Sequence, residues 1–459
     1  MNFQQATKFA SIVKKTLNLF NNQGTSLPGK LVSKVYPRFL SETQNYATSY
    51  KFAITGTNGK TTTAGLLAHI LKQNQKTVIH NDLGANMPNG IITSLALGMN
   101  QAFKKYGENA TVDNFVIEAD EAYLNQITKN ISFDYLLVTN LFKDQSDRYS
   151  EVDYTKEKIR CGIKFNPNLK LVLNAYDPYL FNIDKNIEND LLNKRDERQK
   201  IYFGVENIEY IDYEANSPAN EIIYCPNCKK PLKYSKTFYS QVGHWHCDCS
   251  TSRKTPDVNA DIKIYKDYSI LNIKYKDLSF EIKLNLIGLY NAYNALGAIA
   301  CALCANVKPQ IIKEAIENFK PAFGRDEHVV YKNREVAFYL IKNPTGANEV
   351  LRGLKNLQNA RIMISINDNY ADGRDISWLW DTNFEILANF ENKIYLTGIR
   401  ADDMALRLKY AGVDPLNMVI CNDIKKTFEY AINELEQNEK LVILPTYTSL
   451  LKLNKLIKK

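Results

Sequence analysis

The chain has 459 residues, enough for about three domains of ordinary size. Apolar residues make up 45% and charged residues 24%, which excludes a disordered or fibrous protein. Lysine and arginine outnumber aspartate and glutamate by 58 to 50, and we interpret the resulting charge of +8 as a mild excess spread along the chain. Such a charge suits an anionic substrate or a membrane surface and is too diffuse to indicate nucleic acid.

Two segments are candidates for a membrane-related role, and neither predicts a membrane protein. The N-terminus lacks the basic start and the apolar run of a signal peptide. The uncharged stretch between Leu284 and Val307 contains four asparagines, whose amides are costly in hydrocarbon, so we expect a buried helix there instead of a membrane span. These features predict a soluble, cytoplasmic protein.

Short apolar runs alternate with helical patterns from residue 50 onward. We expect an N-terminal helical segment over residues 1–34 and a central domain over residues 35–323, with strands at 50–55, 115–118, 135–139 and 171–173 and a helix at 61–73. Apolar strands separated by helices predict a parallel sheet covered on both faces. The central domain is therefore expected to be an α/β nucleotide-binding domain.

The second half of the chain changes pattern twice. Alternating polar and apolar residues between 206 and 287 predict antiparallel strands around a cysteine cluster, and helical periodicity returns over 291–319. A second α/β series follows, with strands expected at 336–341, 362–366, 393–397, 418–421 and 441–444. It predicts a Rossmann-like C-terminal domain over residues 324–459.

The strongest motif is T-G-T-N-G-K-T-T, between the first expected strand and the first expected helix of the central domain. Its glycines allow several N–H groups to face one anion, and the helix N-terminus adds a partial positive charge. Lys60 is expected to reach the terminal phosphates of a nucleotide and Thr61 to bind Mg²⁺. The residues expected to bind nucleotide here are Gly56, Thr57, Asn58, Gly59, Lys60, Thr61 and Thr62.

The loop departs from the generic phosphate-loop spacing because Ile54 stands where the first glycine would be. The shorter form, G-T-N-G-K-T, resembles the ATP site of the Mur ligase family, whose members join carboxylates to amines. Val116–Asp120 resembles the family's next motif and implies Glu118 as a second Mg²⁺ anchor and catalytic residue. Thr139–Tyr149 resembles the third, with Asn140 at the nucleotide, although a glutamine stands where many members have histidine.

Two later segments extend this resemblance. Gly288–Asn294 is similar to the family segment that contacts the nucleotide at a helix start, which implies that Asn291 and Asn294 bind ATP; simple helix capping is the alternative. Phe323–Glu327 is similar to the joint before the C-terminal domain, and the resemblance implies that Arg325 faces the γ-phosphate, where charge develops in phosphoryl transfer.

Four cysteines, in the order C-x2-C and C-x-C, fall within 25 residues and predict a structural zinc ribbon over about 222–256. The expected ligands are Cys225, Cys228, Cys247 and Cys249. Because the second pair is spaced more tightly than usual, His244 or His246 could replace the fourth ligand. Cys301 and Cys304 lie in an alanine-rich helical stretch and are expected in the core. One metal site and scattered thiols indicate a reducing compartment.

A zinc ribbon inserted in the central domain resembles the MurT branch of the Mur ligase family, the ATP-dependent subunits of lipid II isoglutaminyl synthases. The resemblance implies amidation of the D-glutamate α-carboxylate of the lipid II stem peptide through an acyl phosphate, with ATP, Mg²⁺ and Zn²⁺ as cofactors. It also implies a GatD-type glutaminase as partner, because the sequence shows no glycine-flanked cysteine nucleophile that could release ammonia. We would then expect the chain at the inner face of the membrane, held there through its substrate.

Two C-terminal motifs are candidates for further roles. Lys342–Asn348 is either a loop and helix cap or a set of amides and a lysine near an anionic substrate. Ile366–Asp381 combines clustered carboxylates with tryptophans that we expect to be exposed; a solvated acidic turn is the alternative. The resemblance implies that an aspartate of this segment completes the partner's catalytic triad. Asp375 is favoured over Asp372, because orienting a partner's histidine requires a carboxylate at the rim.

Two other functions remain open on the sequence. One is a Mur-type or folylpolyglutamate-like ligase that adds an amino acid without a glutaminase partner. The other is a zinc-ribbon ATPase that binds nucleic acid, for which Lys229, Lys230, Lys233 and Tyr234 supply some of the required basic and aromatic residues.

Overall fold

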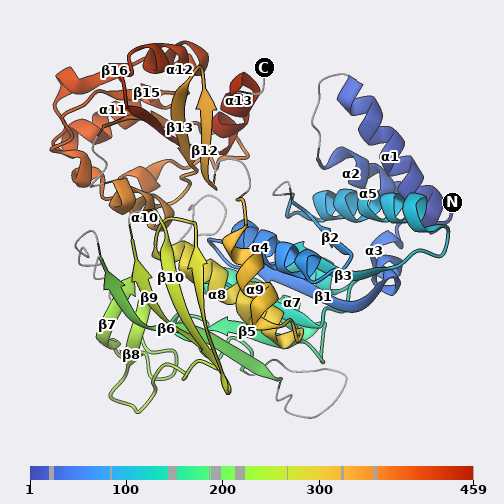
Figure 1. Cartoon of the computed structure of the whole chain (residues 1–459). Coiled ribbons are helices and arrows are strands. Elements are labelled where there is room, and N and C mark those ends of the chain that lie inside the picture. Colours follow the sequence, from blue (N-terminus) through green and yellow to red (C-terminus); the bar gives the residue numbers. More distant parts are fainter. Residues whose placement is uncertain are drawn as a thin grey trace.

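The computed structural model describes residues 1–19, 25–82, 85–142, 152–185, 187, 198–211, 223–265, 267–321, 325–354 and 359–457, except the side chains of residues 325 and 326. Two mixed sheets organise these residues, and a two-stranded hairpin stands beside the larger one (Figure 1). The helices that cover the sheets give each an α/β architecture, in agreement with the predicted fold class.

The larger sheet has nine strands in the order β11-β10-β9-β6-β5-β4-β1-β3-β2. The bounds are β1 Ala47–Thr55, β2 Val78–His80, β3 Val112–Glu118, β4 Tyr135–Val138, β5 Lys170–Asn174, β6 Lys200–Tyr210, β9 Val258–Ile264, β10 Ser269–Tyr275 and β11 Leu278–Leu284. All pairs from β2 to β9 are parallel, whereas β9, β10 and β11 pair antiparallel. The predicted antiparallel strands therefore continue the same sheet at its edge.

Successive residues of a strand point to opposite faces, and β1 shows this directly. Phe52 and Ile54 belong to the core under one set of helices, α4 Lys60–Gln73, α8 Leu289–Cys304 and α9 Pro309–Glu317. Ala53 belongs to the core on the other face. That face carries α1 Phe3–Leu19, α2 Leu27–Val35, α3 Phe39–Thr43, α5 Pro88–Tyr106, α6 Leu124–Thr128 and α7 Val152–Lys164.

The helical pattern predicted over residues 291–319 is confirmed and consists of two helices. The first, α8, ends at Cys304, and Asn306 then adopts a left-handed conformation with φ of 58°. Pro309 starts α9, as suits a residue that has no N–H to donate to a preceding turn. The uncharged stretch that begins near Leu284 is mostly the buried helix α8. Within the described ranges, no helix has the length and hydropathy to cross a bilayer.

The smaller sheet confirms the five strands predicted after residue 323 and adds one. Its order is β12-β13-β17-β14-β15-β16, and only the first pair is antiparallel. The bounds are β12 Arg325–Tyr331, β13 Arg334–Tyr339, β14 Ala360–Ser365, β15 Ile394–Thr397, β16 Met418–Ile420 and β17 Lys440–Pro445, with helices α10 Pro344–Leu354, α11 Ala401–Tyr410, α12 Ile424–Asn433 and α13 Tyr447–Ile457. The domain limits at residues 34 and 323 stay predictions.

Candidate active site and metal centre

The loop between β1 and α4 depends on its two glycines. Gly56 has a φ of 123°, and a Cβ placed on it would lie 2.3 Å from the side-chain oxygen of Thr139. Gly59 has a φ of 83°, and a Cβ there would lie 1.9 Å from Oδ1 of Asn294. Both positions therefore exclude a side chain by conformation and by space. The motif predicted as a phosphate loop has the strand–turn–helix setting that such a loop requires.

Asn140 holds the backbone of this loop in place by hydrogen bonds. Its Oδ1 accepts from the N–H of Asn58 at 2.9 Å, and its Nδ2 donates to the Asn58 carbonyl at 3.1 Å. The backbone carbonyl of Asn140 accepts from the N–H of Thr57 at 3.0 Å. These contacts fix the loop backbone. Asn140, which we predicted to bind nucleotide, therefore has a structural role in the loop.

Asn291 and Asn294 lie in the first turns of α8, and both line the cavity beside the loop. Nδ2 of Asn294 donates to Oδ1 of Asn291 at 3.3 Å, and Nδ2 of Asn291 donates to the Ile287 carbonyl at 2.9 Å. The capping alternative does not account for them, because α8 begins after Gly288 and no side chain caps it. Asn294 instead packs against Gly59, and Asn291 holds the Asn294 side chain.

Lys60 is buried in the loop and paired with Glu121. Its Nζ donates to the carbonyls of Gly56 and Thr57 and lies 2.9 Å from Oε1 of Glu121. Burial alone would lower the pKa of Lys60, but the attraction of Glu121 and its acidic neighbours outweighs this, and the pKa is raised. Burial raises the pKa of Glu121. We did not predict Glu121, although it follows Glu118 in an acidic run at a strand end.

Glu118 ends β3 at the carboxyl edge of the sheet, as predicted. Oγ1 of Thr61 donates to its Oε2 at 2.8 Å, and Nδ2 of Asn86 donates to its Oε1 at 3.1 Å. Asn81 also bonds both the N–H and the carbonyl of Glu118, which fixes the end of the strand. A carboxylate and a hydroxyl in direct contact are oxygen donors of the kind that Mg²⁺ binds, so the residues fit that ion.

A cavity of about 460 Å³ lies between the two sheets, with the phosphate loop as one wall. The start of α10 also lines the cavity, and the segment just before this helix contacts the loop. Nδ2 of Asn343, a buried side chain, donates to Oδ1 of Asn58 at 2.9 Å, and Nδ2 of Asn58 donates back to Oδ1 of Asn343 at 3.3 Å. Nζ of Lys342 donates to the Thr57 carbonyl at 3.4 Å. The C-terminal part of the chain is therefore hydrogen-bonded directly to the loop.

The rest of the cavity wall is strongly aromatic, which the sequence did not predict. Its aromatic side chains come from distant parts of the chain and are Phe142, Tyr239, Tyr290, Tyr339, Tyr370 and Tyr447. Glu349 of α10 also faces the cavity; burial raises its pKa, and Arg352 pairs with it. No local sequence pattern distinguishes these residues from ordinary core residues.

One predicted catalytic residue cannot be placed. Arg325 begins β12, but its side chain lies outside the described residues. The same holds for Phe323 and Gly324, so the predicted joint before the C-terminal domain is only partly within the described structure. The predicted third motif likewise continues beyond Phe142 into residues that are not described.

The acidic segment after β14 holds its two candidate aspartates in different settings. Asp372 is buried, and its carboxylate accepts from the backbone N–H of Thr448 at 2.6 Å and from the Thr448 hydroxyl. It therefore anchors the start of α13, a setting that suits a partner's triad less well than a carboxylate at the rim. Asp375 is half-buried and accepts from the N–H of Ser377 at 2.8 Å and from its hydroxyl at 2.9 Å. Of the two, Asp375 has the position that a rim carboxylate requires.

The expectation of exposed tryptophans in this segment is half wrong. Trp378 is only 5% exposed and belongs to the C-terminal core, because it lies on a short 3-10 helix, Ser377–Leu379, that packs inward. Trp380 is 54% exposed and stacks edge-on against Tyr410 with ring centroids 5.8 Å apart.

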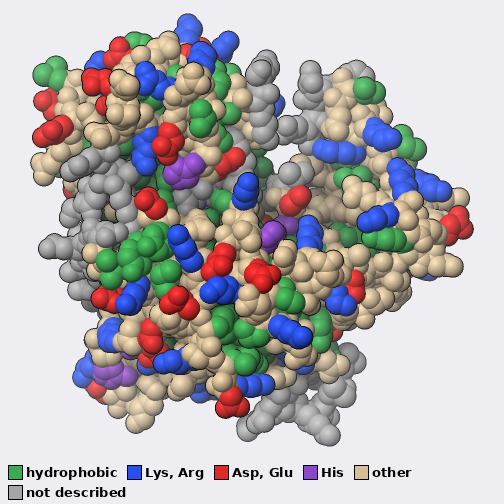
Figure 2. All heavy atoms as spheres, in the orientation of Figure 1, with side chains coloured by type: hydrophobic (Ala, Val, Ile, Leu, Met, Phe, Trp, Pro, Cys, Tyr) green, Lys and Arg blue, Asp and Glu red, His purple; other side chains and the backbone are tan. Residues whose placement is uncertain are grey.

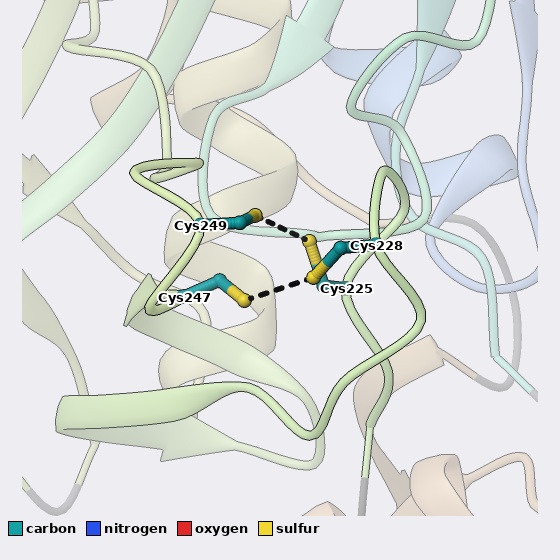
Figure 3. A group of neighbouring side chains, drawn as sticks. All are labelled: Cys225, Cys228, Cys247 and Cys249. Atoms are coloured by element: carbon teal, nitrogen blue, oxygen red, sulfur yellow. Dashed lines mark hydrogen bonds between the residues drawn. The ribbon is translucent and has the colours of Figure 1, made fainter.

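The four cysteines predicted as zinc ligands converge (Figure 3). Sγ of Cys225 lies 3.7 Å from Sγ of Cys249, and Sγ of Cys228 lies 3.4 Å from Sγ of Cys247; all four sulfurs lie within 4.8 Å of one another. Thiolates on a tetrahedral Zn²⁺ stand about 3.8 Å apart, so this donor set fits zinc. The two knuckles flank the hairpin of β7 Lys233–Tyr239 and β8 Val242–His246.

The candidate histidine ligands do not join this group. Among the described residues, the metal-ligand cluster contains only the four cysteines. Nε2 of His244 instead lies 3.7 Å from Oε2 of Glu206 on β6, and its ring packs against Tyr176. The C-x-C pair therefore supplies both of its thiols, and Cys249 is the fourth member.

The hairpin connects the cysteine cluster to the cavity beside the phosphate loop. Tyr239 at the end of β7 is buried, stacks edge-on against Tyr293 of α8 at 5.2 Å and lines the cavity. In the hairpin turn, Nε2 of Gln241 donates to the Leu141 carbonyl at 2.6 Å, next to the residue that supports the phosphate loop. The ribbon thus contacts the segment Asn140–Leu141, which in turn is hydrogen-bonded to the phosphate loop.

Comparison with known proteins matches both parts of this architecture. Residues 54–217 match the family described as Mur ligase middle domain, and residues 340–450 match the family described as MurT ligase C-terminal. The MurT subunit of lipid II isoglutaminyl synthase (glutamine-hydrolyzing) from Staphylococcus aureus strain COL is 33% identical over 447 residues, which cover 97% of this chain and 95% of that protein. The chain belongs to the MurT family.

A second MurT-family subunit of that name, from Streptococcus pneumoniae, is 31% identical over 95% of this chain and 92% of its own length. Solved structures show the same fold. A pseudomurein peptide ligase type C from Methanothermus fervidus superimposes with a TM-score of 0.67 at 22% identity, covering 89% of this chain and 78% of that one. MurF from Thermotoga maritima superimposes with a TM-score of 0.62 at 13% identity, covering 93% and 83%. The predicted Mur ligase fold is confirmed.

Proposed function

We propose that this chain is the ligase subunit of a lipid II isoglutaminyl synthase. It amidates the α-carboxylate of D-glutamate in the lipid II stem peptide to D-isoglutamine, using ATP and ammonia. A GatD-type glutaminase subunit supplies the ammonia. The observation that carries the proposal is the likeness of nearly the whole chain to subunits that bear this name, together with a phosphate loop that opens into a cavity large enough for a substrate.

The residues of the cavity suit the activation of a carboxylate. A carboxylate is a poor electrophile, and transfer of the γ-phosphoryl group gives an acyl phosphate with a good leaving group. The glycines of the loop and the N-terminus of α4 offer N–H groups to the phosphates, and Lys60 adds a positive charge. Thr61 and Glu118 would hold Mg²⁺, which neutralises charge on the phosphates. Asn291, Asn294 and Arg325 are assigned to the nucleotide on the family resemblance.

The arrangement of the cysteines supports the assignment of a glutaminase partner. Four of the eight cysteines form the cluster, and two lie in α8. Among the described residues, no cysteine sulfur is hydrogen-bonded to a histidine. A glutaminase site requires that pair, so we assign it to the second subunit. The aspartate that orients its histidine is Asp375 in this proposal.

The test is reconstitution with a candidate glutaminase, ATP, glutamine and lipid II, followed by mass spectrometry of the product. We expect amidated lipid II only when both subunits and ATP are present, and ammonium salts to replace glutamine and the partner. A ligase that adds an amino acid would instead hydrolyse ATP only when an amino acid is added and would ignore glutamine and ammonia. That outcome would refute the proposal in favour of the amino-acid-adding ligase.

We also propose that the four cysteines bind one structural Zn²⁺. Four thiolates fill a tetrahedral site and leave no position for a substrate, so the ion stabilises the ribbon and takes no part in the chemistry. Because Gln241 connects the ribbon to the segment beneath the phosphate loop, the metal is expected to hold the loop indirectly.

Replacing Cys228 and Cys249 by serine should remove the zinc, since two thiolates do not retain the ion against a chelator. We expect one zinc per chain before and none after, a melting temperature lower by about 10 °C, and weaker binding of a fluorescent ATP analogue. The matched control is Cys161→Ser, outside the cluster, which should keep the metal. Unchanged nucleotide binding by the zinc-free protein would show that the ribbon does not brace the loop.

A further inference from the structure

The net charge of the chain is concentrated at one end, contrary to the even spread expected from composition. The first 41 residues contain five lysines and one arginine and no aspartate or glutamate; the first acidic residue is Glu42. Six of the eight excess charges therefore lie in a segment that forms α1 and α2, while the remaining 418 residues are nearly balanced.

The exposed stripe of α1 is unusual for a solvated helix. Phe3 and Ala10 are buried against the sheet domain, as one face of an amphipathic helix should be. The opposite stripe contains Ile12 and Leu19, which are 63% and 84% exposed, with lysines between them. At a spacing of three or four residues these side chains share one face of the helix.

The exposed part of α2 repeats this composition. Leu27 and Val35 are exposed, and so are Lys30 and Lys34. We call the two stripes together the N-terminal face, made of Lys8, Ile12, Lys15, Leu19, Leu27, Lys30, Lys34 and Val35. The four lysines make no ion pair with any described residue. In Figure 2, lysine and arginine side chains gather over the end of the molecule that α1, α2 and α5 form, with hydrophobic side chains among them.

We propose that the N-terminal face docks the protein on the surface of a bilayer rich in anionic lipids. Lysines around exposed aliphatic side chains on helices that lie along a surface are the composition of interfacial membrane contacts. The lysines are attracted to anionic headgroups, and the aliphatic side chains leave water as they enter the headgroup region. A positive face without one acidic residue matches such a surface in charge.

The position of the face suits a lipid-anchored substrate, and in this respect the inference rests on the proposed function. Thr25 and Ser26 immediately precede α2 and line the cavity of the phosphate loop. A substrate whose headgroup projects from the bilayer would therefore meet the cavity beside the docked helices. Binding to the membrane would be direct, and not only through the substrate.

The decisive measurement is sedimentation of the full-length protein with vesicles that contain no lipid II. We expect binding to vesicles of phosphatidylcholine with phosphatidylglycerol, weakening with added salt, and none to phosphatidylcholine alone. Replacing Lys8, Lys15, Lys30 and Lys34 by glutamine should lower the partition coefficient about 1,000-fold. The variant Ile12→Ser with Leu19→Ser should lower it about 10-fold without changing the charge.

The matched control removes four exposed lysines from α11, α12 and α13, namely Lys409, Lys425, Lys426 and Lys452, and should bind as the unaltered protein does. Equal losses in both lysine sets, or no binding to the anionic vesicles, would overturn the inference. The inference would also be overturned if the protein did not bind vesicles but bound a DNA duplex, and if this binding were lost when the four N-terminal lysines are replaced.

The same variants separate this inference from the proposed function. Amidation of a water-soluble precursor without the lipid tail should be unchanged by the four N-terminal substitutions, while amidation of lipid II in anionic vesicles falls. Vesicle binding by a protein that amidates neither substrate would refute the proposed function and leave the docking face standing. Full activity on both substrates without vesicle binding would refute the docking face alone.

Discussion

Replacing Lys60 by alanine should lower the rate of ATP-dependent amidation at least about 1,000-fold, with glutamine or with ammonium as nitrogen source. The reason is that the lysine places a positive charge inside the phosphate loop, where charge develops on the γ-phosphoryl group. The measurement is the rate of amide formation by mass spectrometry at saturating ATP. Zinc content should not change, because Lys60 is not a member of the cysteine cluster.

This substitution also leaves a buried carboxylate without its ion-pair partner. The experiment therefore has to separate loss of catalysis from loss of stability. Removal of Lys60 leaves Glu121 buried without its partner, which costs about 3–5 kcal/mol when such a pair is broken. The double variant Lys60→Ala with Glu121→Gln removes the charge as well and should regain most of the lost melting temperature while staying inactive. Lys72→Ala, at the exposed end of the same helix, is the control. An active double variant would refute the assignment of this loop to ATP.

The sequence predicted the parts of the site that short motifs encode. Gly56 and Gly59 could be recognised because their spacing and the flanking strand and helix are local features, and Glu118 because it ends a buried strand. The parallel strands followed from apolar runs in the same way. Each of these features is imposed by neighbours within a few residues, which is the information that a single sequence carries.

The remaining parts depend on contacts between segments far apart in the chain. Asn343 and Asn58 meet as an amide pair across 285 residues, and Tyr239 reaches the cavity from a hairpin that the cysteines organise. Glu121 looks like any acidic residue after a strand until Lys60 is seen beside it. Trp378 was misplaced for a similar reason, because its burial is decided by the C-terminal core and not by its polar neighbours.

Replacing Asp375 by asparagine should separate the two nitrogen sources. In the proposed complex this carboxylate orients the histidine of the partner's glutaminase site, so glutamine-driven amidation should fall about 100-fold or more. Amidation driven by a high concentration of ammonium should stay within about twofold, because that reaction bypasses glutamine hydrolysis. The measurement is the ratio of the two rates in the reconstituted complex, with glutamate release as a direct assay of the partner.

The structure supplies controls that distinguish orientation of the partner from support of the local fold. Ser377→Ala removes one hydrogen bond that Asp375 accepts but keeps its carboxylate, so a purely structural role predicts similar losses for both variants. Asp372→Asn should instead depress both nitrogen sources together, because Asp372 anchors the start of α13 beside the cavity. A loss confined to glutamine in Asp375→Asn, and absent from Ser377→Ala, is the result that assigns the carboxylate to the partner's triad. Equal losses with ammonium and glutamine in Asp375→Asn would exclude it, since a group that acts only through the partner cannot slow a reaction that does not need the partner.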